Sequence, residues 1–335
     1  MTRVFRENDA TLEPLRGKRI AVLGYGNQGR AQALNLRDSG LSVIVGNADD
    51  EYAARARADG VPLYPIAEAA ARGDLVMSLL PDEVTPAIYR EAVRPGLSKG
   101  KTLSFASGYC VRFRQIEFPP DINVVMVAPR TIGKAVREHY RRGEGFLSFV
   151  DVHQDADGQA WATALAVAKG IGSLRSYALH VTFKDETELD LFTEQALVPA
   201  LSVVLTTAVE VVLGAGYAKV PALLELYLSG EMGDILHEAA KYGWVGQTGL
   251  HSPTSRYGTK SRLSRFEAPG LRRTMEDVLA YIRSGKFAPE WSAEQAGGYT
   301  RFAAMDEAFK QTPFARAERE VMKELDMNPD PRDAG

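Results

Sequence analysis

The first half of the chain alternates short apolar runs with amphipathic segments. The runs RIAVLG (19–24) and SVIVG (42–46) are rich in β-branched residues and predict strands that are buried on both faces. The stretch between them, NQGRAQALNLRDSG, has helical periodicity and closes on a glycine. Similar apolar runs follow at 75–81, 102–107, 123–129 and 146–152. This alternation predicts a doubly wound α/β Rossmann domain, with a parallel sheet covered on both faces.

The second half has a different pattern, in which long helical segments replace the strands. Residues 183–216 read as one long helix that becomes apolar on every side, and further helical segments follow at 220–243 and 271–285. No strand-like stretch of any strength follows Tyr177. A helix that is apolar all round has to be buried deeply or at a subunit contact. We therefore expect a Rossmann domain over 1–180 and an all-α helical domain over 181–325.

Composition and charge narrow the classes of function. The chain has 335 residues, of which 45% are hydrophobic and 25% charged, as in an ordinary folded protein. Its net charge of -3 offers no broad basic surface, so nucleic acid is not an expected partner. The single cysteine, Cys110, excludes an internal disulfide. The charged N-terminus does not resemble a signal peptide, and the most apolar stretch, 196–216, carries Glu210. We expect a cytoplasmic protein with no membrane partner.

A glycine-rich turn follows the first predicted strand and opens the first predicted helix. Its residues are Gly24, Tyr25, Gly26, Asn27, Gln28 and Gly29. In this strand–turn–helix context the GxGxxG pattern allows the backbone and a helix N-terminus to approach a pyrophosphate. We predict that these residues bind a nicotinamide dinucleotide; the alternative is a glycine turn without a ligand.

The loop after the second strand is expected to contact the adenosine ribose. It contains Asn47, Asp49, Asp50 and Glu51, and no Arg lies between 46 and 51. An acidic side chain here binds the ribose hydroxyl and repels a 2′-phosphate, which favours NADH over the alternative, NADPH. The alternative is that Asp49 or Asp50 caps the next helix, and one residue can do both.

A row of acids opens the long helix. Glu186, Asp190 and Glu194 recur at i, i+4 and i+8, so on a regular α-helix they share one face. Carboxylates in such a row are either a solvated acidic edge or ligands of a hard cation such as Mg²⁺. The spacing alone leaves both interpretations open.

Several motifs together carry a resemblance to a known family. They are GYGNQGRAQALNLRDSG (24–40), LLPDE (79–83), VAPRTIGKAVREHY (127–140), VDVHQDADG (150–158), AKGIG (168–172) and TFKDETELDLFTEQ (182–195). In combination, over nearly the whole chain, they resemble ketol-acid reductoisomerase. That resemblance implies a Rossmann domain followed by a helical domain. It also implies an enzyme that uses two Mg²⁺ ions to shift an alkyl group in an acetohydroxy acid and then reduces the product with a nicotinamide cofactor, in branched-chain amino-acid biosynthesis.

The resemblance also implies roles for individual residues. Asp190, Glu194 and Glu225 match metal-binding acids, and Ser252 with Glu225 matches substrate-binding positions. Catalytic positions fall on Asp190, Glu194, Ser107 and Arg130. The expected cofactor-binding residues, besides the glycine-rich turn, are Asn47, Asp50, Asp82, Glu83, Val84, Thr85 and Gly133.

The chain departs from the family pattern at three places. Ser107 stands where the family has a catalytic His, and Arg130 opens the stretch that replaces Lys-Gly-Pro-Gly-His. Ser229 stands where the second Glu of the partner metal helix is expected. On a continuous helix Glu231 points about 200° away from Ser229, which makes it a poor substitute. We expect one Mg²⁺ ion or none, and an alkyl migration that is impaired or lost.

These observations together predict an NAD(P)H-dependent reductase acting on a small 2-keto or 2-keto-3-hydroxy acid, or on a related cyclic imine. The alternatives are a fully active reductoisomerase and a non-catalytic cofactor-binding paralogue. The family's shorter members, whose length this chain shares, take the second metal helix from a partner subunit. We therefore expect a homodimer with its active sites at the subunit interface.

Overall fold

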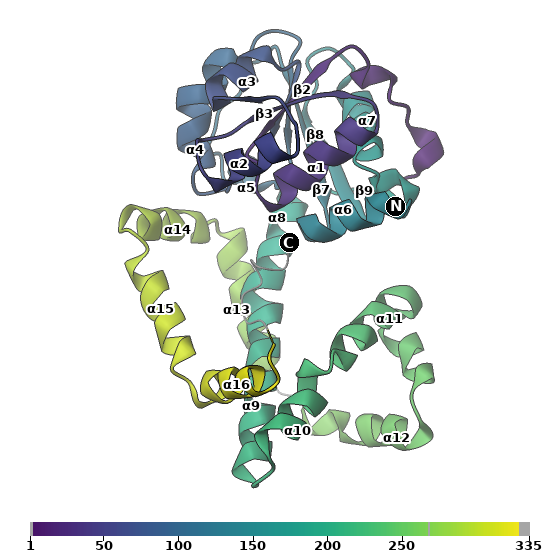
Figure 1. Cartoon of the computed structure of the whole chain (residues 1–335), viewed down its shortest axis with the longest axis vertical. Helices are drawn as coiled ribbons and strands as arrows, with labels where there is room; N and C mark the ends of the chain where they lie inside the picture. Colours follow the sequence, from purple (N-terminus) through teal and green to yellow (C-terminus); the bar gives the residue numbers. More distant parts are fainter. Residues whose placement is uncertain (1–2, 267–268, 328–335) are drawn as a thin grey trace. The chain divides into compact units, whose positions relative to one another are not determined.

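The computed structural model describes residues 3–266 and 269–327 and divides into two compact units, Met1–Asp190 and Leu191–Gly335. The first unit is an α/β domain and the second consists of helices (Figure 1). The fold class expected from the sequence, a Rossmann domain followed by a helical domain, is confirmed.

The first unit is built on one nine-stranded sheet. Its strands are β1 (Val4–Phe5), β2 (Arg19–Leu23), β3 (Ser42–Gly46), β4 (Leu63–Tyr64), β5 (Leu75–Ser78), β6 (Thr102–Phe105), β7 (Asn123–Pro129), β8 (Ser148–Gln154) and β9 (Ala178–His180). Their order across the sheet is β1-β9-β8-β7-β6-β5-β2-β3-β4. From β4 to β7 all neighbours are parallel, in the order that defines a Rossmann sheet, and the strand order reverses between β2 and β5.

The far edge of the sheet corrects the sequence prediction in two respects. Strand β8 runs antiparallel to β7, and β1 runs antiparallel to β9, so the sheet is mixed rather than wholly parallel. Strand β9 begins at Ala178, beyond Tyr177, where no further strand was expected. It has only three residues, which is too short a stretch to show an alternating pattern.

Helices cover both faces of this sheet (Figure 1). The helices that begin in this unit are α1 (Asn27–Asp38), α2 (Glu51–Ala58), α3 (Ile66–Arg72), α4 (Thr85–Ile88), α5 (Tyr109–Arg112), α6 (Gly133–Arg141), α7 (Ala160–Gly170) and α8 (Phe183–Phe192), together with a π-helical turn at Tyr89–Val93 and 3-10 turns at Glu7–Asp9, Glu13–Leu15, Arg94–Gly96 and Ser173–Arg175. Alternate strand residues such as Ile20, Val22 and Val125 pack into one core with α1 and α7. Their neighbours along the strand face α3 on the other side, as Leu23 does beside Ala69. Both faces are therefore apolar, as the continuous runs predicted.

The second unit contains the remaining helices of the described residues. They are α9 (Val198–Gly214), α10 (Lys219–Leu223), α11 (Glu231–Gly246), α12 (Pro253–Arg262), α13 (Pro269–Arg283), α14 (Phe287–Ala296), α15 (Thr300–Lys310) and α16 (Pro313–Glu324), with π-helical turns at Thr193–Leu197 and Leu224–Leu228 and 3-10 turns at Gln247–Leu250 and Leu263–Arg265. A small core joins α9, α10 and α16 through Val209, Leu223, Phe314 and Val321.

The long apolar helix predicted from the sequence is present as one continuous run of 32 residues, Phe183–Gly214. By length and composition it is long and apolar enough to cross a membrane, which the sequence reading of residues 196–216 did not anticipate. Only 11% of its most apolar window is buried within the chain. Its aliphatic surface is therefore largely exposed in a single copy of the protein.

The helix expected over 220–243 is broken. Gly230 adopts a left-handed conformation with φ of 89°, which ends the turn at Leu224–Leu228 before α11 begins at Glu231. Glycine adopts this conformation without the steric cost that a Cβ atom brings. The 200° separation expected between Ser229 and Glu231 assumed a continuous helix and is wrong. A second left-handed glycine, Gly243, kinks α11 near its end.

Candidate active site

The glycine-rich turn lies at the point where the strand order reverses, between the end of β2 and the start of α1. Gly24 has a φ of +87°, and a Cβ atom there would come within 2.8 Å of the carbonyl oxygen of Leu79. A Cβ at Gly29 would collide with the Gly24 carbonyl. A Cβ atom added at Gly26, the N-cap of α1, would have no other atom within 4 Å. The helix N-terminus is thus open to an anion, as dinucleotide binding requires.

Two of the predicted cofactor residues hold this turn in place. Tyr25 is buried, its hydroxyl donates to Asp59 at 3.0 Å, and its backbone N–H donates to the side-chain oxygen of Asn47 at 2.9 Å. Burial and the neighbouring Asp59 carboxylate raise the pKa of the Tyr25 phenol well above its usual range. The Tyr25 side chain therefore ties the turn to the end of α2 and does not face the cleft.

A cavity of about 620 Å³ lies beside the loop after β3. Its lining includes Asn47, Ala48, Asp49, Arg57 and Ile66. The Asp49 carboxylate accepts from the Arg57 guanidinium at 2.9 Å. By its place on a Rossmann sheet this cavity suits the adenosine end of a dinucleotide.

Asp50, which was expected to contact the ribose, caps the next helix. Its carboxylate caps α2 by accepting from the backbone N–H groups of Tyr52 and Ala53, and it also accepts from the Asn47 amide at 2.7 Å. Asp50 is not among the residues that line the adenosine-side cavity, whereas Asp49 is. The capping interpretation left open by the sequence therefore applies to Asp50.

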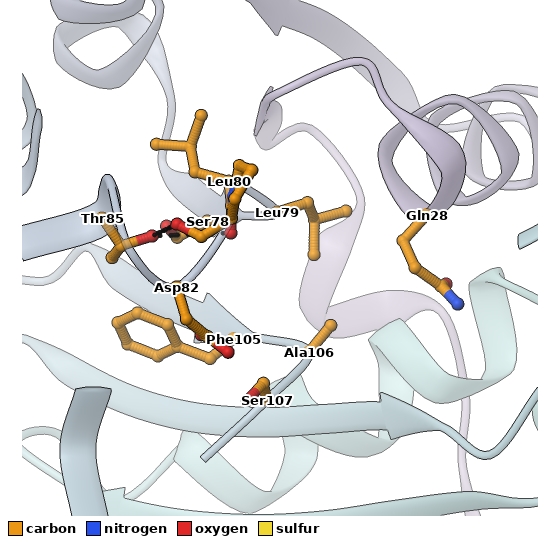
Figure 2. Close-up of a pocket in the computed structure, with 10 residues that line it drawn as sticks. Gln28, Ser78, Leu79, Leu80, Asp82, Thr85, Phe105, Ala106 and Ser107 are labelled. Atoms are coloured by element: carbon orange, nitrogen blue, oxygen red, sulfur yellow. Dashed lines mark hydrogen bonds between the residues drawn. The ribbon is translucent and has the colours of Figure 1, made fainter. Parts of the chain in front are cut away.

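A second pocket, of about 190 Å³, lies where the ends of β5 and β6 meet α1. Figure 2 shows Gln28 on one side of it, with Asp82, Thr85 and the ring of Phe105 on the other. Ser107 also lines it. Thr85 donates its hydroxyl to the Pro81 carbonyl at 2.9 Å, which closes the loop on itself.

Of the loop residues predicted to bind cofactor, Asp82 and Thr85 line this pocket, whereas Glu83 and Val84 are not among its lining residues. The sequence reasoning missed Ser78 and Phe105, which line it. Ser78 ends β5, which borders the point of strand reversal, and Phe105 ends the neighbouring strand β6; a place at the carboxyl end of these strands is the signal by which both could have been found.

The loop that carries Arg130 is anchored on the glycine-rich turn. Gln28 donates from Nε2 to the Thr131 carbonyl at 2.8 Å. A Cβ at Gly133 would collide with the carbonyl of Asn27, so glycine permits the close approach of α6 to the start of α1. Gly133, predicted to bind cofactor, thus packs directly against the turn that would hold the pyrophosphate.

Next to Ser107, a charged cluster lies on the first two turns of α8. Arg130 donates from Nη1 to Glu186 at 3.0 Å and from Nη2 to Asp190 in a short ion pair. The backbone N–H of Gly108 donates to the other oxygen of Glu186 at 2.7 Å. A Cβ at Gly108 would collide with the carbonyl of Phe183. The loop that positions Ser107 is therefore packed directly onto this helix.

Glu186 is the most deeply buried acid of the cluster, with 1% of its side chain exposed. Burial raises the pKa of Glu186 to about 7, against the lowering effects of the Gly108 N–H and the Arg130 guanidinium. The negative charge of Asp190 acts in the same direction as burial. The carboxyl group of Glu186 therefore changes protonation near neutral pH.

The other acids implied by the resemblance lie in the second unit. Glu194 and Glu225 are exposed, and each lies in a π-helical turn. Ser252 is the N-cap of α12, where its hydroxyl accepts from the Ser255 N–H at 3.2 Å. Glu231, dismissed on the sequence, is the first residue of α11 and lines a pocket with His251 and Ser255.

The arrangement of these acids bears on whether a magnesium ion fits. Within residues 3–266 and 269–327, no three His, Cys, Asp or Glu side chains gather so that they could hold a metal ion. Asp190, the first expected ligand, is already bound by the Arg130 guanidinium. Mg²⁺ demands near-ideal octahedral oxygen ligands and dehydrates reluctantly. With its carboxylate paired to the Arg130 guanidinium, Asp190 is not arranged as a ligand of this ion.

A Rossmann cleft with an open helix N-terminus, an adenosine-side cavity and a second pocket beside an acid–arginine cluster defines the class of protein. Such a site is typical of NAD(P)H-dependent oxidoreductases.

Comparisons with known proteins identify the family. Residues 14–176 match the acetohydroxy acid isomeroreductase, NADPH-binding domain, and residues 183–327 match the ketol-acid reductoisomerase, C-terminal domain. The chain belongs to the ketol-acid reductoisomerase family, whose members use NAD(P)H and Mg²⁺.

Individual relatives are similar along nearly their whole length. The chain is 40% identical to a ketol-acid reductoisomerase (NADP(+)) of Pyrobaculum calidifontis over 97% of this chain and 99% of that protein. It is 40% identical to the enzyme of the same name from Pyrobaculum arsenaticum over 92% and 94%. A solved structure of an NADH-preferring ketol-acid reductoisomerase from an uncultured archean matches with a TM-score of 0.90 at 34% identity, covering 96% of this chain and 98% of that one.

Proposed function

We propose that this protein transfers a hydride from NADH to a small 2-keto acid, a 2-keto-3-hydroxy acid or a related cyclic imine, and that it catalyses the alkyl migration of its family slowly or not at all. The observation that supports the proposal is that a glycine-rich turn suited to a dinucleotide lies beside an altered reaction site. Gln28, Asp82 and Thr85 line the pocket that also contains Ser107, while the cluster next to it has an arginine and no imidazole.

Reduction makes modest demands on such a site. The hydride adds to the carbonyl carbon, the electron pair of the C=O bond moves to oxygen, and that oxygen takes a proton while NADH becomes NAD⁺. A fixed guanidinium such as that of Arg130 stabilises the negative charge that develops on oxygen. Glu186, whose pKa burial raises to about 7, is an acid of suitable strength beside it.

Alkyl migration demands more, since a tertiary alkoxide and a polarised carbonyl have to be stabilised together. Ser229 stands in place of one expected carboxylate, and Ser107 stands in place of the expected imidazole. The fully active reductoisomerase stays the second candidate, because relatives about 40% identical over most of the chain bear that name.

A turnover screen of the purified chain tests the function. NADH and NADPH are supplied with 2-keto acids, acetolactate and cyclic imines, with and without Mg²⁺. We expect reduction of a 2-keto acid or an imine, and little or no conversion of acetolactate. The variant S107H/S229E/R130M, which restores two family residues and releases Asp190 from its guanidinium, should gain acetolactate conversion.

Two outcomes contradict the proposal. Efficient magnesium-dependent conversion of acetolactate by the wild type means that the protein is an ordinary reductoisomerase. Tight cofactor binding without turnover of any compound means that it is a non-catalytic paralogue.

We propose further that the protein prefers NADH, and that Asp49 is the residue that sets the preference. Asp49 lines the adenosine-side cavity and pairs with Arg57, which lines it too. The carboxylate offers an acceptor to a ribose hydroxyl and neutralises the one guanidinium there that would bind a 2′-phosphate.

Replacement of Asp49 by Ser tests this assignment. We expect the ratio of kcat/KM with NADPH to that with NADH to rise about tenfold, or about 1.4 kcal/mol, because Arg57 is released. Asp50→Ala is the control: it removes the cap of α2 and should lower stability by about 1 kcal/mol with little change in that ratio. A wild type that prefers NADPH tenfold, or an effect seen only at Asp50, contradicts the assignment.

We also propose a homodimer in which the exposed face of α9 meets a second copy of the chain. Leu201, Val203, Val204 and Val211 are each more than half exposed on this helix. A stripe of aliphatic side chains of that length is rare on the surface of a monomer and is typical of an interface.

A further inference from the structure

Arg130 bridges two acids of α8 that lie one helical turn apart. Its two terminal nitrogens donate to Glu186 and Asp190, so one cation serves both carboxylates. The spacing of the two nitrogens in a planar guanidinium suits this arrangement, and a single ammonium group could not reproduce it.

The guanidinium is held from several sides. Its central carbon lies 5.0 Å from the centre of the Phe149 ring, and the Arg130 backbone N–H donates to the Leu147 carbonyl at 2.8 Å. Glu186 is fixed in turn by the N–H of Gly108. Because 25% of the Arg130 side chain and 1% of the Glu186 side chain are exposed, this ion pair is largely shielded from water and is not a mobile surface contact.

The position of this cation conflicts with a divalent ion at the same acids. A metal ion bound to Asp190 would have to displace the guanidinium or accept a positive charge beside it. Both are unfavourable, because displacement leaves Glu186 buried without its charged partner, and a metal ion beside the guanidinium meets a like charge.

We propose that Arg130 is a protein-borne cation that takes the place of a divalent metal ion at Asp190, so that this site works without metal. The inference deepens the proposed function, on which its catalytic meaning rests. Its central prediction concerns metal affinity and is independent of turnover.

Binding of Mn²⁺, which prefers the same oxygen ligands as Mg²⁺, tests the proposal. The free Mn²⁺ signal is followed by electron paramagnetic resonance during titration of the full-length protein, with and without NADH. We expect the wild type to bind Mn²⁺ at least tenfold more weakly than Arg130→Met. Adding Asp190→Asn to that variant should remove the gained affinity, and Arg130→Lys, which keeps the charge, should not gain it.

Arg112→Met is the matched control, because Arg112 pairs with Glu188 on the same helix at 2.8 Å and is similarly buried. That substitution removes a comparable guanidinium from another acid of the same helix and should create no Mn²⁺ affinity. If Arg130→Met gains no affinity, whether both proteins bind Mn²⁺ or neither does, the proposal is overturned. Circular dichroism confirms that each variant is folded before it is titrated.

These measurements distinguish failure of the role proposed for Arg130 from failure of the proposed reductase function. Turnover of a 2-keto acid that EDTA abolishes overturns the role of Arg130 but leaves the reductase standing. A gain of Mn²⁺ affinity in Arg130→Met without turnover of any substrate supports the role of Arg130 and contradicts the proposed reductase function.

Discussion

At the scale of single residues, the balance of forces on Glu186 is the most informative feature of the site. The carboxyl group is removed from water, yet two donors, Gly108 and Arg130, favour its charged form. Burial outweighs them and raises the pKa of Glu186 to about 7. The protonation of one buried side chain is therefore coupled to the stability of the first unit.

That coupling predicts a dependence of stability on pH. Between about pH 4.5, the ordinary pKa of the group, and about pH 7, the folded chain keeps a proton that the unfolded chain releases. The contribution of Glu186 to the free energy of unfolding therefore decreases as pH rises through this window, by about 3 kcal/mol in all, and is constant above it. Glu186→Gln should lack this decrease.

Urea unfolding of the wild type and of Glu186→Gln at a series of pH values measures the difference. Asp185→Asn removes an exposed carboxylate of the same helix and controls for the loss of one charge. A difference between wild type and Glu186→Gln that does not change between pH 5 and pH 8 would contradict this account.

Gly108 is the second residue whose environment yields a prediction. Because a Cβ atom there would meet the Phe183 carbonyl and the Thr187 hydroxyl, Gly108→Ala has to push the Ser107 loop away from α8. We expect a loss of about 1–3 kcal/mol of stability, together with a weakened hydrogen bond to Glu186. Gly258→Ala, at a helical position with nothing within 4 Å, should be neutral or stabilising by up to about 1 kcal/mol. Equal effects of the two substitutions would show that the close packing at Gly108 does not matter.

At the scale of elements, the helix from Phe183 to Gly214 links a charged end to an apolar end. Its first turns present Glu186 and Asp190, while α9 packs on its own unit only along a narrow side through Val209, Val212 and Leu213. The remaining aliphatic surface is exposed, and Val204 is 67% exposed. Such a face needs a partner to remove it from water.

The partner proposed for α9 is a second copy, and its loss is measurable. Leu201→Glu combined with Val204→Glu places two charges in the exposed stripe and should convert a dimer into a monomer at micromolar concentration, by light scattering. Desolvating those charges in an apolar interface is strongly unfavourable. Thr206→Glu, at a less exposed position of the same helix, is a comparison for the added charge alone. A wild type that is monomeric, or that partitions into lipid vesicles, contradicts the proposed dimer.

At the scale of the whole molecule, the cofactor residues and the helical domain occupy different units. The glycine-rich turn, the loop after β3 and the pocket at Gln28 all belong to Met1–Asp190. Ser252, Glu225 and Glu231 belong to the other unit. Binding of the cofactor should therefore reduce local opening of the backbone mainly in the unit Met1–Asp190.

Hydrogen exchange with and without saturating NADH checks this division. We expect protection of backbone amides around Gly24–Gly29, Asn47–Asp50 and Leu79–Thr85, and little change in α14, α15 and α16. At one hundred times the dissociation constant, the cofactor should stabilise the unit that binds it by about 2.7 kcal/mol. Protection spread evenly over both units would contradict the assignment of the cofactor cleft to the first.

Much of the fold was predictable because its signals are local. The runs at 19–24 and 42–46, and the glycines between the first strand and helix, act through neighbours in the chain and needed no knowledge of the rest. The antiparallel edge and strand β9 were not predictable, because three residues carry no period and strand direction depends on the connections around them.

The sequence by itself determined the Rossmann pattern, the glycine-rich turn, the acids of α8 and the long apolar helix, since periodicity and turn chemistry act over a few residues. The tertiary structure decided what those residues do. It placed Arg130 against Glu186, 56 positions away, and against Asp190, and it assigned the cap of α2 to Asp50 and the cavity to Asp49. Contacts between distant segments depend on how whole elements pack, and a pattern along the chain does not contain that information.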